Sequence, residues 1–171
     1  MQASNCGGAR AIPQGCRPKS TIVVSETNVA KILDYDLYGM TIVSLSNREY
    51  AVGTDEEANA ATYGYIKDSV WSFNFNPDFI ASHAIIDDVD VIKLIQAKCE
   101  DANPTLHKLI PDFDKFFSDA VDGDGRGHFL SSYDGNEYTL CDIDDDDAQE
   151  IAELLEIDTE EFSSYYVYRL N

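Results

Sequence analysis

A chain of 171 residues with 44% hydrophobic residues, including 10 Tyr and 8 Phe, can fill a substantial core, which excludes disorder throughout. Its 32 acidic and 12 basic residues give a net charge of −20, which repels nucleic acid and anionic membranes and favours basic partners. The four cysteines form no C-x-x-C pair, and no stretch approaches the roughly 20 apolar residues of a membrane span. We therefore expect a cytoplasmic protein with neither signal peptide nor membrane helix.

The first 20 residues are rich in Gly, Pro, Ser, Arg and Cys, lack periodicity and contain three basic residues but no acid. This composition predicts a flexible N-terminal arm, 1–20, before a single domain, 21–171. That domain carries 9 basic and 32 acidic residues, a charge of −23. At its start, Thr21–Val24 is a short β-branched run, and Ser25 can cap a short helix through Ala30 and Leu33.

A β-hairpin is predicted next, from the runs 38–45 and 49–52. A loop at Asn47-Arg48 would place four large apolar side chains on one face of the pair. These are Val43, Leu45, Tyr50 and Val52.

Helix signals dominate the middle of the chain. Thr54 and Glu57 form a capping box that predicts a helix to about Phe73, with Tyr63, Ile66 and Val70 on its buried face and Trp71 in the core. Two further helices are expected to start at Asn76-Pro77 and at Asp87-Asp88. The second would carry Val91, Ile92, Ile95 and Cys99 along one side, and a last helix would bury Phe113, Phe116 and Phe117.

The tail reads as a β-β-α-β unit. A hairpin over 127–140 is predicted around Asp134-Gly135, which suits a type I′ turn, and Phe162–Leu170 is expected to form a further strand. Strands near both ends with helices bunched between them predict an α+β fold. We expect a small, mainly antiparallel sheet of two hairpins and the C-terminal strand, covered by helices within 54–121.

Eleven acids and no Lys or Arg occupy residues 142–161. Ala148, Ile151, Ala152 and Leu155 can fix one side of a helix here to the core, leaving carboxylates on the other side. A fixed array of this kind could present a DNA-like row of charge to a basic groove, although a merely solvated acidic face has the same composition. The candidate partner-binding residues are Asp144, Asp145, Asp146, Asp147, Glu150 and Glu153.

Two segments imitate calcium loops. The stretch 122–133 starts like an EF-hand but has Arg126 at position 5 and Tyr133 in place of the bidentate glutamate. In the stretch 142–153 four acids have the correct spacing, but Asp147 replaces the glycine of the turn. A helix start, with Asp147 and Glu150 as a capping pair, is the simpler interpretation, and we predict no metal or cofactor.

Catalytic signals are weak. His83, His107 and His128 lack metal-ligand spacing, although the predicted tail hairpin would place His128 opposite Cys141. No nucleophile elbow, phosphate loop or zinc-protease helix is present, so we expect no enzymatic activity.

With its GRGHFLSSYDGNE segment and terminal YYVYRLN, the chain resembles small acidic proteins of unknown function encoded by bacteriophages and other mobile elements, mainly over residues 122–171. TDEEANAATYGYIKDSVWSFN is a second, lesser point of similarity. The resemblance implies a bacterial cytoplasm, where acidic proteins that imitate DNA block host defence enzymes. It implies no catalytic residues, and the basic arm, 1–20, departs from the acidic character of that group.

Three functions remain open on these observations. The leading hypothesis is a non-enzymatic acidic binding protein, a DNA mimic that inhibits a basic nucleic-acid-binding protein without binding nucleic acid or membrane itself. The second is a metal-dependent enzyme of nucleic-acid metabolism, with Asp122, Asp124, His128 and the cluster 142–147 as ligands. The third is a structural interaction module with exposed apolar patches.

Overall fold

The computed structural model of the protein describes residues 30–72 and 75–171. The predicted arm, 1–20, the run Thr21–Val24 and the helix cap Ser25 lie outside the described residues, as does Phe73.

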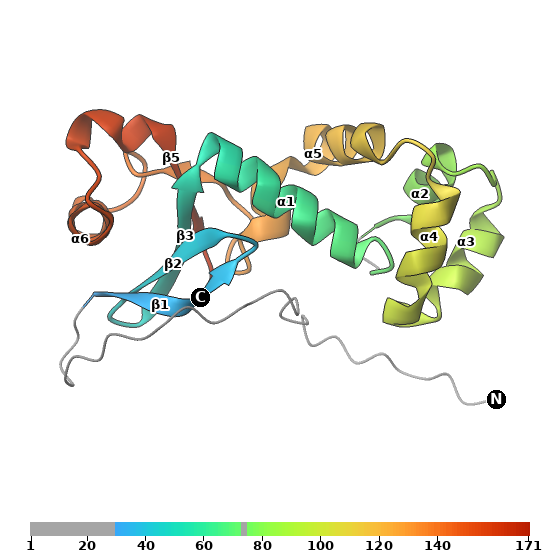
Figure 1. Cartoon of the computed structure of the whole chain (residues 1–171), viewed down its shortest axis with the longest axis horizontal. Coiled ribbons are helices and arrows are strands. Elements are labelled where there is room, and N and C mark those ends of the chain that lie inside the picture. The colour runs from blue at the N-terminus through green and yellow to red at the C-terminus, as the bar shows by residue number, and fades with distance from the viewer. Residues whose placement is uncertain (1–29, 73–74) are drawn as a thin grey trace.

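The described chain contains a five-stranded antiparallel sheet together with helices, which confirms the α+β prediction (Figure 1). The order across the sheet is β1-β2-β3-β5-β4, so the C-terminal strand lies beside the N-terminal hairpin. The strands are β1 (Lys31–Leu37), β2 (Met40–Leu45), β3 (Arg48–Thr54), β4 (Tyr138–Thr139) and β5 (Tyr165–Arg169).

The predicted N-terminal hairpin is present as β2 and β3. Its loop is Ser46-Asn47, one residue earlier than predicted, because Leu45 pairs with Arg48. Val43, Leu45, Tyr50 and Val52 are all buried in one cluster, as the alternation predicted.

The short helix through Ala30 and Leu33 is a wrong prediction for the described residues. Lys31–Leu37 is strand β1, and Ile32 lies opposite Val43 on β2. The turn at Tyr38-Gly39 has positive φ at both residues, 52° and 101°, which matches the right-handed twist of a two-residue hairpin. Pairing with β2 therefore outweighs the local helix signal.

The helices of the middle segment begin where their caps predict. The Thr54–Glu57 capping box starts α1 (Asp55–Ser69), which ends four residues before Phe73, and Asn76 and Asp88 cap the next two helices. The remaining elements up to residue 130 are α2 (Pro77–His83), α3 (Val89–Gln96), the 3-10 helix η1 (Cys99–Ala102), α4 (Asn103–Leu109) and α5 (Phe113–Leu130).

The predicted hairpin over 127–140 is wrong. Residues 127–130 are helical and belong to the short part of α5 that follows a kink at Gly125 (φ 75°), and only Tyr138–Thr139 forms a strand, which pairs with β5. A close approach explains the difference: a Cβ on Gly127 would lie 2.5 Å from the Asn136 carbonyl carbon, so the loop packs directly on the helix backbone. His128 and Cys141 consequently do not face each other across a ladder, whereas Gly135 does keep the predicted positive φ, 74°.

The rest of the tail follows the predicted order. Helix α6 (Asp145–Leu155) and the 3-10 helix η2 (Thr159–Ser164) lead into β5, which starts three residues after Phe162.

The sheet is covered on both faces. Ala58 and Ala61 of α1 pack with Met40, Ile42 and Tyr168 on one face. Ile151 of α6 packs on the other face, among Val43, Tyr50 and Val167. The end of α1, α2–α4 and α5 form a separate helical core at the opposite end of the molecule, as Figure 1 shows. Within the two described ranges, no helix combines the length and apolar character needed to cross a membrane.

Candidate functional site

Helix α6 is built from the acidic run and fixed by its apolar side. Asp144 is the N-cap, and its side chain accepts a hydrogen bond from the Asp146 backbone amide at 3.2 Å. The helix thus begins three residues before the predicted Asp147 cap, with Asp145, Asp146 and Asp147 in its first turn, where the helix dipole favours anions. Ala148, Ile151 and Ala152 are buried against the sheet, as predicted.

Asp147 points inward and is 4% exposed. Its carboxylate contacts the Arg48 guanidinium at 2.7 and 2.8 Å and accepts a hydrogen bond of 2.7 Å from the Tyr50 hydroxyl. Burial, and then this bond to Asp147, raises the pKa of Tyr50 to about 12. Because both oxygens of Asp147 are occupied, this predicted partner-binding residue acts as an internal anchor that joins α6 to β3.

The other five predicted residues are exposed. Asp146, Glu150 and Glu153 are spaced by four and three positions, which places them on one helix face about 5–6 Å apart, with Asp144 and Asp145 at the N-terminal end. We call Asp144, Asp145, Asp146, Glu150 and Glu153 the α6 acidic face. Among the described residues, no Lys, Arg or His side chain forms an ion pair with it.

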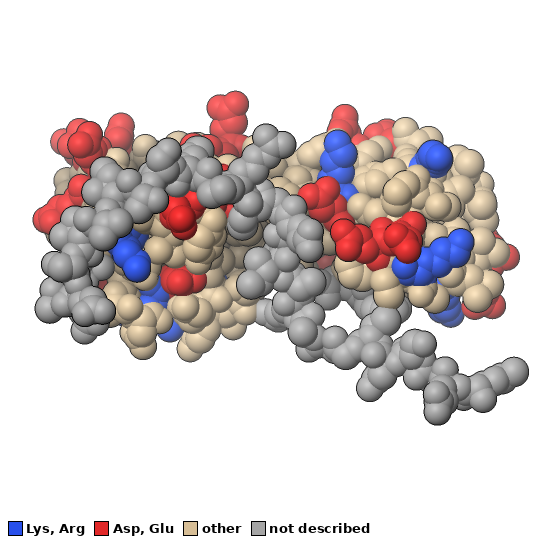
Figure 2. Space-filling view, turned by 60° about the horizontal axis from the view of Figure 1, so that its bottom comes forward, with Lys and Arg blue, Asp and Glu red and all other residues tan. Residues whose placement is uncertain are grey.

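The charge around this face is one-sided over a long stretch of chain. Residues 127–168 contain 13 acids and no Lys or Arg. Glu156, Asp158, Glu160 and Glu161, which follow α6, are exposed as well. In Figure 2, acidic groups lie at the end of the molecule that carries α6 and also at the helical end, and basic groups are visible at both ends. The four exposed acids that follow α6 therefore extend the negatively charged surface beyond this helix.

The ligands of the metal-enzyme hypothesis are not brought together. Asp122, Asp124 and His128 lie on α5, whereas Asp142 accepts hydrogen bonds from Thr139 (2.6 and 2.9 Å), which lower its pKa. Asp144 caps α6 and Asp147 bonds to Arg48. Within the described chain, no group of three or more His, Cys, Asp or Glu side chains is placed to hold a metal ion.

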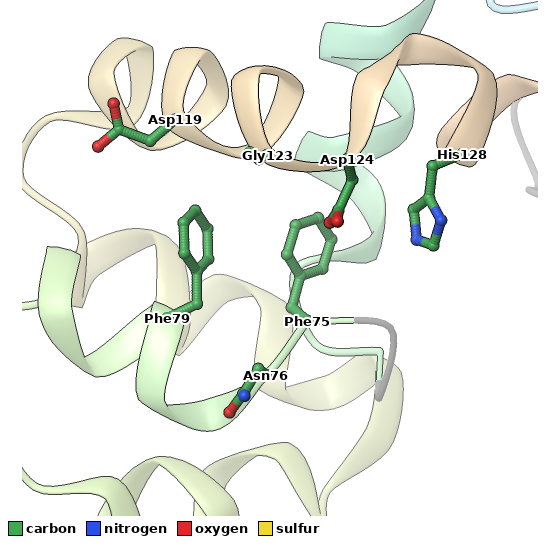
Figure 3. A pocket seen from close by; sticks show the side chains of 8 residues that line it. Phe75, Asn76, Phe79, Asp119, Gly123, Asp124 and His128 are labelled. Atoms are coloured by element: carbon green, nitrogen blue, oxygen red, sulfur yellow. The ribbon is translucent and has the colours of Figure 1, made fainter. Parts of the chain in front are cut away.

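Two of those residues line a pocket instead. Asp124 and His128 of α5 face Phe75 and Phe79 across a hollow of about 370 Å³ (Figure 3). His83 contacts Asp119, which also lines this pocket, at 2.9 Å, and His107 contacts the Lys67 carbonyl at 2.6 Å. Trp71 packs at the edge of the helical core and donates a hydrogen bond to the Asp68 carbonyl.

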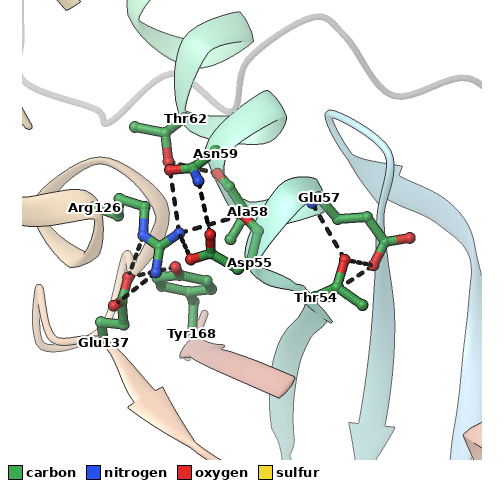
Figure 4. Close-up of polar contacts among 9 residues, drawn as sticks. All are labelled: Thr54, Asp55, Glu57, Ala58, Asn59, Thr62, Arg126, Glu137 and Tyr168. Atoms are coloured by element: carbon green, nitrogen blue, oxygen red, sulfur yellow. Dashed lines mark hydrogen bonds and ion pairs between the residues drawn. The ribbon is translucent and has the colours of Figure 1, made fainter. Parts of the chain in front are cut away.

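Arg126 is the centre of a polar network (Figure 4). In the sequence it was noted only as a residue that does not match the ligand pattern of a calcium loop. Its guanidinium contacts Glu137 through two nitrogens (2.7 and 2.9 Å) and Asp55 through a third (2.7 Å), and it lies 4.4 Å from the Tyr166 ring centroid. Burial lowers the pKa of Arg126, but the bonds to Glu137 and Asp55 outweigh it and raise the pKa overall. A lone arginine in a glycine-rich stretch of an acidic chain is the signal that could have identified this network.

Tyr168 completes the network. Its hydroxyl donates to Glu137 at 2.5 Å, and burial, followed by that bond, raises the pKa of Tyr168. The network joins α1, α5, β5 and the segment before β4, so Arg126 is committed internally and does not neutralise the α6 acidic face.

Comparison of the chain with protein-family models, with curated proteins and with solved structures finds no significant match.

Proposed function

We propose that this protein is a non-enzymatic acidic binding protein whose α6 acidic face occupies the basic groove of a nucleic-acid-binding protein, as a DNA mimic, and thereby inhibits it. The main observation in support of this proposal is the way in which α6 is attached to the sheet. Its inner side is fixed to the sheet by Ile151 and by the Asp147–Arg48 ion pair, while its outer side presents carboxylates without a described counter-ion. A rigid, uncompensated row of carboxylates suits recognition of a basic surface.

Electrostatics explains how such a face would compete with DNA. Carboxylates on successive helix turns, about 5–6 Å apart, can contact the Lys and Arg side chains that otherwise neutralise phosphates. A chain of net charge −20 also steers a basic partner during encounter, an effect that salt weakens. Because α6 is held in place before binding, little conformational entropy is lost on association.

The partner class follows from the charge and from the resemblance to proteins of mobile elements. A basic bacterial protein that binds nucleic acid, such as a host defence enzyme, is the expected target. Direct binding to nucleic acid or to an anionic membrane is disfavoured by the same charge.

Affinity capture from a bacterial lysate tests the proposal. A basic nucleic-acid-binding protein should be retained at low salt, released at high salt and displaced by duplex DNA. Purified partner and protein should then bind with an affinity that falls linearly with salt on a logarithmic scale, and the protein should inhibit the partner's action on DNA.

A neutralised variant separates the α6 acidic face from bulk charge. Its changes are D144N, D145N, D146N, E150Q and E153Q, and Asn at position 144 retains the helix cap. The matched control removes five exposed acids outside α6 through D87N, D90N, E100Q, D101N and D122N. The first variant should lose at least tenfold in affinity, and the control less than threefold. Equal losses, or no captured basic partner, would reject the proposal.

The metal-enzyme alternative has its own test in the same preparation. Thermal melting with Ca²⁺, Mg²⁺ or Mn²⁺ at 100 times the dissociation constant would add about 2.7 kcal/mol to the free energy of unfolding if one of these ions bound. An unchanged melting temperature with all three would remove that alternative.

A further inference from the structure

We propose that the pocket between α2 and α5 binds an organic cation, a guanidinium or alkylammonium group carried on an apolar stem. This site lies at the helical end of the molecule and is independent of the α6 acidic face. The pocket is lined by two aromatic side chains, one carboxylate without a described cation and one glycine, among other residues.

The apolar wall of the pocket is held in place before any ligand arrives. Phe75 is 4% exposed and stacks on Phe129, with ring centroids 5.9 Å apart and an interplanar angle of 14°. Phe79 packs on Phe116, at 5.0 Å between centroids. Phe79 is only partly buried, so this fixed ring offers contact area without a large loss of side-chain freedom on binding.

The polar side of the pocket is anionic. Asp119 is already bonded to Lys115 at 2.6 Å and to His83 at 2.9 Å, whereas Asp124 forms no ion pair with any described cation. Figure 3 shows the Asp124 side chain directed from α5 toward Phe75, beside His128. A carboxylate attracts positive charge, so Asp124 favours a cation in this hollow, and the Phe79 ring offers apolar contact to the stem that carries the charge.

Gly123 is one of the residues that line the hollow. A Cβ at this position would meet no atom within 4 Å. The volume of the hollow is about 370 Å³, which lies within the range of small-ligand sites. Phosphate or carboxylate ligands are disfavoured by Asp124.

Titration with butylguanidinium, followed by backbone amide NMR, tests the assignment. Uncharged butylurea, which has nearly the same shape, is the matched control. Butylguanidinium should bind with a dissociation constant on the order of 1 mM and shift the amides of Gly123, Asp124 and His128, and butylurea should bind at least tenfold more weakly. Equal binding of the two compounds, or shifts confined to other segments, would overturn the proposal.

Three variants test whether the residues of the pocket bind the cation. D124N should weaken butylguanidinium binding at least fivefold, while D122N, the same charge change two residues away and outside the pocket lining, should change it less than twofold. Gly123→Leu should abolish binding, with folding checked by thermal melting, and if that variant does not fold, the comparison of D124N with D122N decides alone. Equal effects of D122N and D124N would mean diffuse attraction and reject the site.

Two further binding measurements identify the source of the cation and test whether this site is independent of the α6 acidic face. Tighter binding of N-acetyl-arginine methylamide than of butylguanidinium supports the site with an arginine side chain as the natural ligand, and weaker binding supports it with a free small cation. The neutralised α6 variant should bind butylguanidinium within twofold of the wild type. Loss of binding in that variant would overturn the claim of an independent site.

Discussion

Arg48 and Asp147 stand 99 positions apart in the sequence and form a two-point ion pair, with Nη1–Oδ2 at 2.7 Å and Nη2–Oδ1 at 2.8 Å. The side chain of Asp147 is 6% exposed and that of Arg48 is 37% exposed, so the pair closes the edge of the core between β3 and α6. Together with the packing of Ile151, this pair holds α6 against the sheet and so orients the carboxylates on the outer side of the helix.

Substituting Arg48→Met should lower the free energy of unfolding by about 2 kcal/mol, because Asp147 would stay buried with Tyr50 as its remaining donor. The value is set below that of a fully buried pair because Arg48 is partly exposed. Urea denaturation measures the change. Lys93→Met, which breaks an exposed pair with Asp90, is the control and should change stability by less than about 0.5 kcal/mol. Equal losses in the two variants would show that the Arg48–Asp147 pair has no special structural role.

Substituting Arg126→Lys should destabilise the fold by about 2–4 kcal/mol although the charge is kept, because one ammonium cannot reproduce the two-point contact with Glu137 together with the contact to Asp55. Thermal melting and urea denaturation should agree on the loss. Lys98→Met, at an exposed position, serves as the surface control. A stability of Arg126→Lys equal to that of the wild type would show that net charge alone is sufficient at this position.

The free energy of unfolding should fall as pH rises from about 10 to about 12. Tyr50 has an ordinary pKa of 10.0 that burial and Asp147 raise to about 12, so in this window the unfolded chain loses a proton that the folded chain retains. The stabilisation is fully present below pH 10 and is lost as pH approaches 12; Tyr168, whose pKa is also raised, adds to it in the same direction. Urea denaturation at several pH values measures the slope. Tyr50→Phe should make the slope shallower, and an unchanged slope in that variant would contradict the assignment.

Two glycines of α5 should respond oppositely to alanine. At Gly127 the added Cβ would lie 2.5–2.7 Å from backbone atoms of residues 135–137, so Gly127→Ala should cost about 2 kcal/mol or more. At Gly123 the Cβ meets nothing within 4 Å, and Gly123→Ala should stabilise the helix by about 0.5 kcal/mol. Thermal unfolding of the two variants side by side gives the comparison. A stable Gly127→Ala protein would mean that the 131–137 loop can move off the helix.

Local signals predicted the elements that depend on a few neighbouring residues. The capping box at Thr54 and Glu57 and the cap at Asn76 each satisfy backbone donors within one helical turn, so their effect is decided locally. The hairpin of β2 and β3 was predicted for a similar reason, since alternation placed Val43 and Tyr50 on the same face. The apolar side of α6 and the exposure of Glu150 and Glu153 also followed from helical spacing.

The sequence by itself determined the α+β class, the acidic surplus and the helix with an apolar and an acidic side, because these depend on composition and on periodicity over one or two turns. Only the tertiary structure decided three further points. Residues 127–130 are helical because the 131–137 loop packs on Gly127 and β5 takes Tyr138 as its partner. Asp147 is an anchor because β3 brings Arg48 to it, and Asp124 reaches a pocket because Phe75 and the following helix α2, which carries Phe79, lie opposite α5. Each of these contacts joins segments far apart in the chain, and neither propensity nor spacing specifies which distant segments will meet.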